Sequence, residues 1–272
     1  MTKREYKIGL ELTDKQWKKL QPLLPEPPRS DKGGQVPAPN RACLEGILWL
    51  LRSGARYKDV PKHFPSGSTC WRRLEWWYEQ GAVLDAWQKI LGLLDKKGRI
   101  QWKECFADAT FSPAKKRGEA VGKTKKGKGT KIMALADGHG TPMTTLLESA
   151  TPNEVKLIEP TIAKVRVPKL GRGRPRTKLQ RLIYDKAADS DPLRLRMKSR
   201  RIDLIVPHRE NRVKPSMQDG RKLRRYRRRW KIERTISWIQ DCRRLVVRYD
   251  HKISMFTAYT QLACLMIALK RL

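Results

Sequence analysis

The sequence predicts an α/β protein, in which a mixed sheet with flanking helices follows an all-α region. Two observations support this fold class. Before about residue 98, apolar residues recur at helical spacing between breaks that contain Gly and Pro. From there on, short β-prone runs alternate with helical segments, the pattern of a sheet covered by helices. We therefore expect two domains, a helical one over residues 1–97 and a sheet-containing one over residues 98–272.

Helix signals follow one another along the first domain. Thr13 and Gln16 form a capping-box pattern ahead of an apolar helix. The Pro- and Gly-rich stretch 25–40 is expected to be a mobile loop. Further helices are expected over residues 41–53, 57–64 and 68–80.

The helices 57–64 and 68–80, joined by a turn at 65–67, have the outline of a helix-turn-helix unit. Arg72 and Arg73 lie near the start of the second helix, where such units contact base edges or phosphates. Any small helical bundle gives the same pattern, so a purely structural role stays open. Trp71 and Trp77 are interpreted as core residues rather than as stacking platforms.

The second domain begins with three expected strands and then alternates. Strands are expected over residues 104–111, 130–137, 141–148, 181–185 and 202–207. Helices are expected over residues 153–166, 190–200, 221–244 and 254–271. The second and third strands are joined by a hairpin turn that starts at Asp137.

The charge balance points to a polyanionic partner. The chain has 61 Lys and Arg against 27 Asp and Glu, a net charge of +34. Nucleic acid is the expected partner, since phosphates bind such surfaces strongly through counterion release. A well-solvated surface and an acidic membrane surface are the alternatives, and no free basic amphipathic segment supports the second.

Two basic segments strengthen this interpretation. Residues 169–181 carry six basic side chains, and Arg172 and Arg174 stand in an Arg-Gly-Arg-Pro sequence similar to a minor-groove A·T hook. A plain phosphate-binding loop explains this segment equally well. Residues 115–131 carry eight basic side chains and are expected to become ordered only on DNA.

The cysteines and histidines indicate neither disulfides nor zinc. The five Cys form no C-x-x-C pair, as expected of reduced thiols in a cytosolic protein. The four His form no zinc-type cluster, so a metal would be held by carboxylates, which favours Mg²⁺ or Mn²⁺. No signal peptide is expected, and the apolar run 255–269 is too short to span a bilayer.

Three acids occupy elements whose own geometry does not require an acid. Asp108 interrupts an apolar strand, Asp185 ends another, and Glu233 lies in a strongly basic helix. A buried carboxylate is costly unless it is paired or binds a cation. Capping of a following turn is the structural alternative for Asp108 and Asp185. By contrast, Asp189 and Asp191 are interpreted as helix caps.

The helix expected over 221–244 gathers unusual residues on one stripe. At about 100° per residue, Tyr226, Arg229, Glu233 and Gln240 fall within an arc of roughly 60°. This pattern is typical of an acid that holds a metal against a phosphate. Attack by Tyr226 itself is an alternative, but the Arg-His-Arg constellation that such chemistry needs is not apparent.

Three blocks in this order resemble the DDE transposases of bacterial insertion sequences. They are ADATFSPAKKRG around Asp108, LIYDKAADSDPLR around Asp185 and YRRRWKIERTISWIQDCRRL around Glu233. The last resembles the signature Tyr-x2-Arg-x3-Glu-x6-Lys, with Gln240 at the Lys position. The N-terminal LTDKQWKKLQPLLP is similar to the start of the insertion-sequence-five group.

The resemblance implies a ribonuclease H-like fold, with Asp108 on the first strand, Asp185 on the fourth and Glu233 on the helix after the fifth. It implies that these catalytic acids hold two Mg²⁺ or Mn²⁺ ions. Contacts with DNA are expected from Arg72, Arg73, Arg172, Arg174, Tyr226, Arg229 and Gln240. Gln240 can donate a hydrogen bond but lacks the charge of the Lys that it replaces.

The implied function is a transposase that binds terminal inverted repeats, cleaves them and joins the 3′-OH ends to target DNA. It would act as a homodimer or larger synaptic complex, in the bacterial cytoplasm at the nucleoid and away from membranes. A catalytically inactive DNA-binding descendant is one alternative. A ribonuclease H-type nuclease without strand transfer is another, and it would need no N-terminal reading domain.

Overall fold

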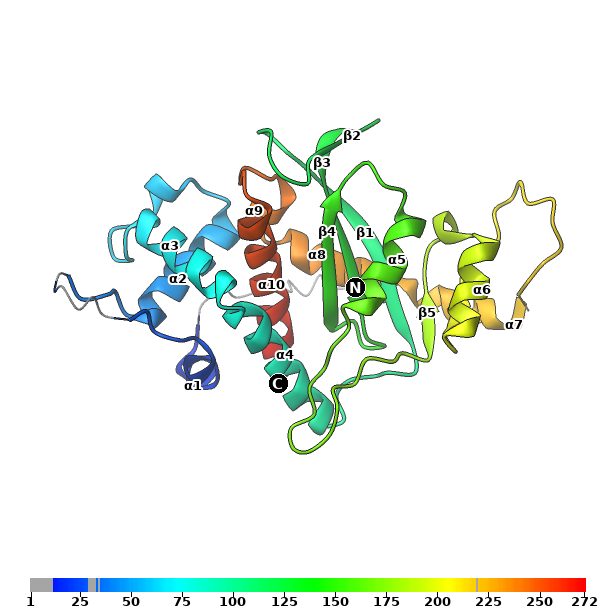
Figure 1. Ribbon diagram of the computed structural model, residues 1–272, viewed down its shortest axis with the longest axis horizontal. Helices are drawn as coiled ribbons and strands as arrows, with labels where there is room; N and C mark the ends of the chain where they lie inside the picture. Colours follow the sequence, from blue (N-terminus) through cyan, green and yellow to red (C-terminus); the bar gives the residue numbers. More distant parts are fainter. Residues whose placement is uncertain (1–11, 29–32, 34, 219) are drawn as a thin grey trace, which may run out of the picture. The chain divides into compact units, whose positions relative to one another are not determined.

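The computed structural model describes residues 12–28, 33, 35–218 and 220–272. Their contacts divide the chain into two compact units, and most of their helices and strands are labelled in Figure 1. The helical unit contains the described residues up to Ile90, Lys115–Glu119 and Trp238–Leu272. The sheet unit contains Leu91–Ala114 and Ala120–Ser237.

The helical unit combines helices from the two ends of the chain. Its helices are α1 (Asp14–Leu20), α2 (Asn40–Ser53), α3 (Gly67–Glu79), α4 (Ala82–Lys96, which continues into the sheet unit), α9 (Arg243–Val246) and α10 (Ile253–Lys270). Single 3-10 turns are η1 (Gln21–Leu23) and η2 (Tyr57–Asp59). The capping box of Thr13 and Gln16 is confirmed at the start of α1. Part of the stretch 25–40 lies outside the described residues.

The C-terminal helix α10 supplies much of the core of this unit. It packs against α3 and α9, and α9 packs against α2. By length and composition α10 is apolar enough to cross a membrane, but 72% of it is buried inside the protein, as in a core helix. By its contacts, α10 belongs to the same compact unit as the N-terminal helices. The expected boundary between functional domains at residue 97 stays a prediction.

The expected helix-turn-helix is not confirmed. Only the 3-10 turn η2 forms where a helix was expected over 57–64. The helix before α3 is therefore α2, which ends at Ser53. α3 itself begins at Gly67, where Ser66 Oγ accepts a hydrogen bond from the amide of Thr69 at 3.2 Å.

The sheet unit confirms a mixed sheet with flanking helices. Its strands are β1 (Cys105–Pro113), β2 (Gly122–Thr124), β3 (Gly127–Ala136), β4 (Pro142–Ser149), β5 (Arg181–Ile183) and β6 (Asp203–Ile205). The strand order is β2-β3-β1-β5-β6, and β4 also pairs with β3. β1 is antiparallel to β3 but parallel to β5, and β5 is parallel to β6.

Helices connect and flank these strands. They are α5 (Glu154–Ala163), α6 (Asp191–Ser199), α7 (Gly220–Leu223) and α8 (Trp230–Gln240), with 3-10 segments η3 (Lys186–Ala188) and η4 (Arg224–Arg229). All expected strands of this domain are present, and the strands from β1 to β5 are labelled in Figure 1.

Two expectations for the basic segments are corrected. The short strand β2 and its hairpin with β3 lie in the stretch 115–131, which was expected to be ordered only on DNA. The single helix expected over 221–244 is divided into η4, α8 and α9. The α-helical stripe therefore holds from Trp230 to Gln240 but not for Tyr226 and Arg229, which lie in the 3-10 segment.

Candidate active site

The register of β1 and β5 brings two of the predicted acids together. In this parallel pair Phe106 lies opposite Ile183. Asp108 and Asp185 each follow two residues later on their own chains. Because side chains two residues apart in extended chain share one face, both carboxylates come to the same face at the same level. Asp185 also accepts a hydrogen bond from the amide of Ala187 at 3.3 Å, so the expected turn cap is present as well.

The third acid is held in place by the attachment of α8 to the β3–β4 turn. Lys231 Nζ donates to the carbonyl oxygen of Gly138 at 2.6 Å, and Thr235 Oγ1 donates to that of Gly140 at 2.8 Å. The turn is rigid because the buried Asp137 carboxylate accepts hydrogen bonds from the amides of His139 and Thr141. These contacts fix the helix that carries Glu233.

The three acids meet at the guanidinium of Arg229. Its Nη2 lies 2.5 Å from Asp108 Oδ2 and 3.8 Å from Asp185 Oδ2, while its Nη1 lies 2.7 Å from Glu233 Oε1. The side chain of Arg229 is 17% exposed, and its buried Nε has no hydrogen-bond partner. Asp108 and Glu233, which are 125 residues apart in the sequence, thus share one cation with Asp185.

Burial disfavours the charged form of Asp108, and a nearby cation can offset this cost. Burial raises the pKa of the Asp108 carboxyl, and the positive charge of Arg229 acts against this rise. Asp185 adds a further negative charge beside it. The site therefore concentrates negative charge that one arginine does not balance.

The donor set fits a hard divalent cation. Carboxylate oxygens are the ligands that Mg²⁺ and Mn²⁺ prefer. Here three carboxylates surround one guanidinium, so negative groups outnumber the positive one. Within the described part of the chain, no three acid, His or Cys side chains form a ready metal-binding group. Binding of a metal by these acids therefore requires the guanidinium of Arg229 to withdraw.

Two supporting clusters around the site were missed by sequence reasoning. Tyr184, buried directly before Asp185, donates its hydroxyl to Glu154 Oε2 at 3.0 Å. Glu104 accepts hydrogen bonds from Arg225 at 2.8 Å and from Arg228 at 2.5 Å, which anchors η4. No local sequence signal separates these residues from ordinary surface or core positions.

The expectation that Asp189 is a helix cap is corrected. Ser190 is the N-cap of α6, and Asp191 is the first residue of that helix, paired with Arg212 at 2.8 Å. Asp189 is instead a buried carboxylate, bonded to Arg194 at 2.9 Å.

The predicted DNA contacts divide into exposed and buried residues. Arg72 is exposed on α3. Arg73 is 6% exposed and donates to the side chain of Asn40 and, at 2.9 Å, to the carbonyl oxygen of Ala38. Its guanidinium therefore makes its contacts inside the helical unit, which contradicts the expected contact with DNA. The remaining predicted contacts are exposed or half-buried: Arg172, Arg174, Tyr226, Arg229 and Gln240.

Comparison with known proteins places the chain in a family. Residues 103–267 match the family "Transposase DDE domain", and residues 12–91 match "Putative transposase of IS4/5 family". The first match covers more than half of the chain, so the protein belongs to the DDE transposases, enzymes that cleave DNA and transfer its strands. Within that class, it is a transposase of an insertion sequence.

Two of its relatives come from a bacterial insertion element. The chain is 36% identical over 117 residues to "Insertion element IS402 uncharacterized 16.2 kDa protein" of Burkholderia cepacia, which covers 42% of this chain and 80% of that protein. It is 28% identical over 139 residues to "Putative transposase for insertion sequence element IS402" of the same organism, which covers 51% of this chain and 62% of that protein.

Solved structures show weaker likeness. A piggyBac transposase synaptic complex with hairpin DNA has a TM-score of 0.47 at 10% identity, covering 97% of this chain and 74% of that one. The Mos1 strand transfer complex has a TM-score of 0.27 at 13% identity, covering 78% and 82%. The family assignment depends on the sequence matches alone.

Proposed function

We propose that this transposase binds the terminal inverted repeats of an insertion sequence, cleaves phosphodiester bonds there and joins the 3′-OH ends to target DNA. The catalytic residues are Asp108, Asp185 and Glu233, which hold two Mg²⁺ or Mn²⁺ ions. One observation carries this proposal: three acids from β1, from the end of β5 and from α8 converge on the single guanidinium of Arg229.

We further propose that the sheet unit has the ribonuclease H-like fold. Asp108 lies on the first strand and Glu233 on a helix that follows the last strand, β6. Asp185 follows β5, which is the fourth strand once the short β2 is set aside. This order supports the placement of the acids that the family resemblance implies.

Each residue of the site has a proposed role in the reaction. Two metal ions, when bound, activate the attacking water or 3′-OH and stabilise the leaving oxygen. Asp108, Asp185 and Glu233 position those ions. Arg229, released from the acids, offers two Nη groups that match the oxygens of a phosphate. Tyr226 contacts the same strand, and Gln240 donates a hydrogen bond to a phosphate further along.

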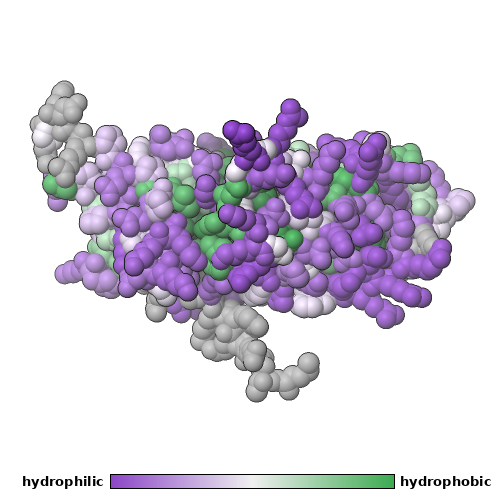
Figure 2. Space-filling model, turned by 90° about the horizontal axis from the view of Figure 1, so that it is seen from below, coloured by the Kyte–Doolittle hydropathy of each residue, from purple (hydrophilic) through white to green (hydrophobic). Residues whose placement is uncertain are grey.

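DNA binding is proposed for both domains, residues 1–97 and 98–272. A net charge of +34 supports broad phosphate binding, and the face shown in Figure 2 is dominated by hydrophilic residues. Arg72 is the candidate for reading the repeats, while Arg172 and Arg174 lie exposed in the 169–181 loop and contact phosphates. The active form is a homodimer or larger complex on DNA, in the bacterial cytoplasm at the nucleoid.

Cleavage of labelled element ends in Mg²⁺ tests the catalytic assignment. Asp108→Asn, Asp185→Asn and Glu233→Gln should each abolish cleavage but leave DNA affinity nearly unchanged, because many Lys and Arg residues carry binding. Asp191→Asn is the matched control, since Asp191 pairs with Arg212 outside the site. Full activity of Asp185→Asn, or equal loss in the control, would refute the assignment. Binding without any cleavage by the wild type would indicate the inactive descendant.

A further inference from the structure

The helical unit contains a hollow that none of the predicted DNA contacts lines. It has a volume of about 780 Å³ and lies between the 57–64 segment and the start of α3. Much of its wall is apolar, with contributions from Val60, Pro61, Phe64 and Trp71. Its size is within the range of ligand sites in proteins, roughly 300–1,000 Å³.

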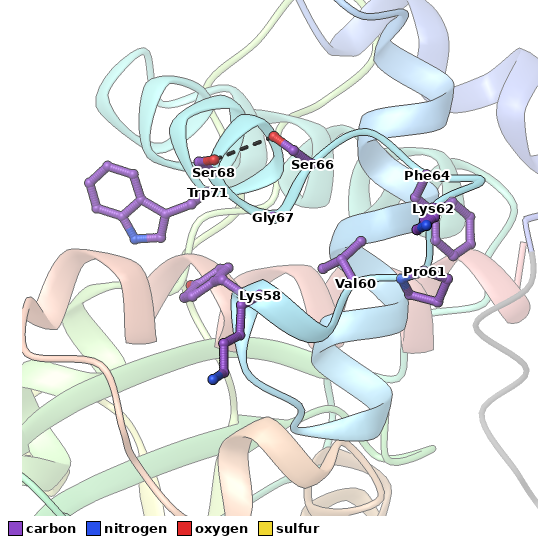
Figure 3. A pocket seen from close by; sticks show the side chains of 10 residues that line it. Lys58, Val60, Pro61, Lys62, Phe64, Ser66, Gly67, Ser68 and Trp71 are labelled. Carbon is purple, nitrogen blue, oxygen red and sulfur yellow. Dashed lines mark hydrogen bonds between the residues drawn. The ribbon is translucent and has the colours of Figure 1, made fainter.

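Trp71 gives this hollow a flat aromatic wall. Figure 3 shows its indole on one side and the side chains of Pro61 and Phe64 on the other. The sequence interpretation of Trp71 as a core residue is wrong, since it is half-buried, whereas Trp77 is 1% exposed and does belong to the core. Lys252 Nζ lies 5.3 Å from the centroid of the Trp71 ring. A half-exposed indole can stack on a nucleobase.

The charged side chains that line the hollow are positive. Lys58 and Lys62 line it and are exposed, and no Asp or Glu is among the described residues that line it. Asp59, which lies between these lysines in sequence, is paired with Arg56 at 2.8 Å. An apolar cavity with a basic rim is complementary to a nucleotide, which combines a flat base with an anionic phosphate.

The floor of the hollow is fixed before any ligand binds. The Tyr57 hydroxyl donates to Asp250 Oδ1 at 3.2 Å and accepts from the Tyr259 hydroxyl at 3.2 Å. The guanidinium of Arg244 lies 4.5 Å from the Tyr57 ring centroid and pairs with Asp250 at 2.8 Å, and both charged side chains are buried. A Cβ on Gly67 would clash with the carbonyl oxygen of Tyr57, so α3 and η2 are in direct contact. A preformed site loses little free energy to ordering.

We propose that this hollow binds an unpaired nucleotide of DNA, with the base stacked on Trp71 and the phosphate beside Lys58 and Lys62. The nucleotide must be unpaired because a base inside a duplex is already stacked on both of its faces. This inference rests on the proposed binding of DNA by the protein. It adds to that function a preference for DNA with frayed or single-stranded ends.

Fluorescence anisotropy on the full chain tests this site. Affinity is compared at one salt concentration for a blunt duplex and for the same duplex with a short single-stranded tail. The wild type should prefer the tailed DNA by about tenfold, the contribution of one stacked base. Trp71→Ala should abolish this preference, and Trp71→Phe should retain most of it, because an aromatic ring remains.

Two controls separate base stacking from charge. Tyr249→Ala removes an exposed aromatic side chain of the same unit that does not line the hollow, and it should keep the full preference. A tail of abasic sites keeps the phosphates without the bases and should bind like the blunt duplex. Equal affinity of the wild type for blunt and tailed DNA, a preference that survives in Trp71→Ala, or tight binding of the abasic tail would each overturn the inference. Failure to bind either DNA would overturn the proposed function as well.

Discussion

At the scale of single residues, the sheet unit depends on a buried carboxylate outside the active site. Asp189 accepts hydrogen bonds from Arg194 at 2.9 Å and from the amide of Arg209 at 2.9 Å, and it contacts His208 Nδ1 at 3.0 Å. The side chains of Asp189 and Arg194 are 3% and 7% exposed. Asp189 thereby ties α6 to the segment after β6, four residues beyond the catalytic candidate Asp185.

Asp189→Asn should destabilise the protein at pH 7 by about 3–5 kcal/mol, the cost of removing one partner from a buried ion pair. Burial acts to raise the pKa of Asp189, but hydrogen bonds from Arg209, Arg194 and His208 outweigh it and lower the pKa. Its stabilisation is therefore complete above the unfolded pKa of about 3.9 and is lost as the pH falls through the lower folded value.

Urea unfolding at a series of pH values measures this effect. The difference between wild type and Asp189→Asn should shrink below about pH 4. Asp191→Asn serves as the control, because Asp191 belongs to a more exposed pair and should change stability little. A destabilisation that is equal in both variants, or that does not depend on pH, would show that Asp189 has no special role.

Arg229→Lys tests whether the shape of the guanidinium matters as well as its charge. Lysine keeps the positive charge but cannot offer two Nη groups to the oxygens of one phosphate. We expect the cleavage rate to fall about tenfold or more, with a much smaller change in DNA affinity. Single-turnover cleavage and anisotropy measure the two quantities separately. Cleavage at the wild-type rate would disprove a specific role for Arg229 in the reaction.

At the scale of elements, α10 completes a unit that begins at the other end of the chain. It packs on α3. Just before α10, Asp250 pairs with the buried Arg244 and accepts a hydrogen bond from the Tyr57 hydroxyl. A fragment of residues 1–97 should therefore lack a cooperative thermal transition. The same residues joined by a flexible linker to residues 238–272 should regain one.

Circular dichroism and amide NMR dispersion of the two fragments decide this prediction. A fully folded 1–97 fragment would show that α10 is dispensable to the helical unit. If the joined fragment also fails to fold, the missing part is the short segment 115–119, which belongs to this unit as well.

Local patterns predicted the elements of the sheet unit well. Each expected strand is present. Alternating apolar runs and the hairpin turn at Asp137 depend on residues that are close together in the sequence. Asp108 and Asp185 stood out because each acid followed or interrupted such a run. Their proximity then follows from a parallel register that no single segment contains.

The errors arose where distant residues decide the outcome. Arg73 is a plausible DNA contact on an isolated helix, but Asn40, 33 residues earlier, receives its guanidinium in the core. Asp189 has the spacing of a helix cap, but its carboxylate is buried in contact with Arg194 and His208. The helix expected over 221–244 changes to a 3-10 segment where Glu104 binds its arginines. Propensity alone does not encode these long-range partners.

At the scale of the whole molecule, charge should dominate the strength of DNA binding. With a net charge of +34, affinity for random DNA should fall steeply with salt, by about 10³-fold or more between 50 and 200 mM if six or more phosphates are contacted. Removing Arg172 and Arg174 together should reduce the slope of log affinity against log salt by about one to two, without changing sequence preference.

Arg72→Ala should act differently, by lowering the affinity for the inverted repeat towards that for random DNA. One base contact contributes about 1–3 kcal/mol of discrimination. Competition binding at one salt concentration measures the ratio of the two affinities. An unchanged ratio would mean that Arg72 only solvates the face of α3.

The discontinuous build of the helical unit also sets an order of events during synthesis. Chains emerge from the ribosome N-terminus first, and domains generally fold as units. The helical unit needs residues 238–272, so its first helices must wait while the whole sheet unit is made. A chain that ends before Trp230 would carry neither α8 with Glu233 nor α10, and one that ends before Ile253 would still lack α10. Translation that stops early should therefore yield no half-active product, and DNA binding by the helical unit becomes a proof that the catalytic acids have already been synthesised.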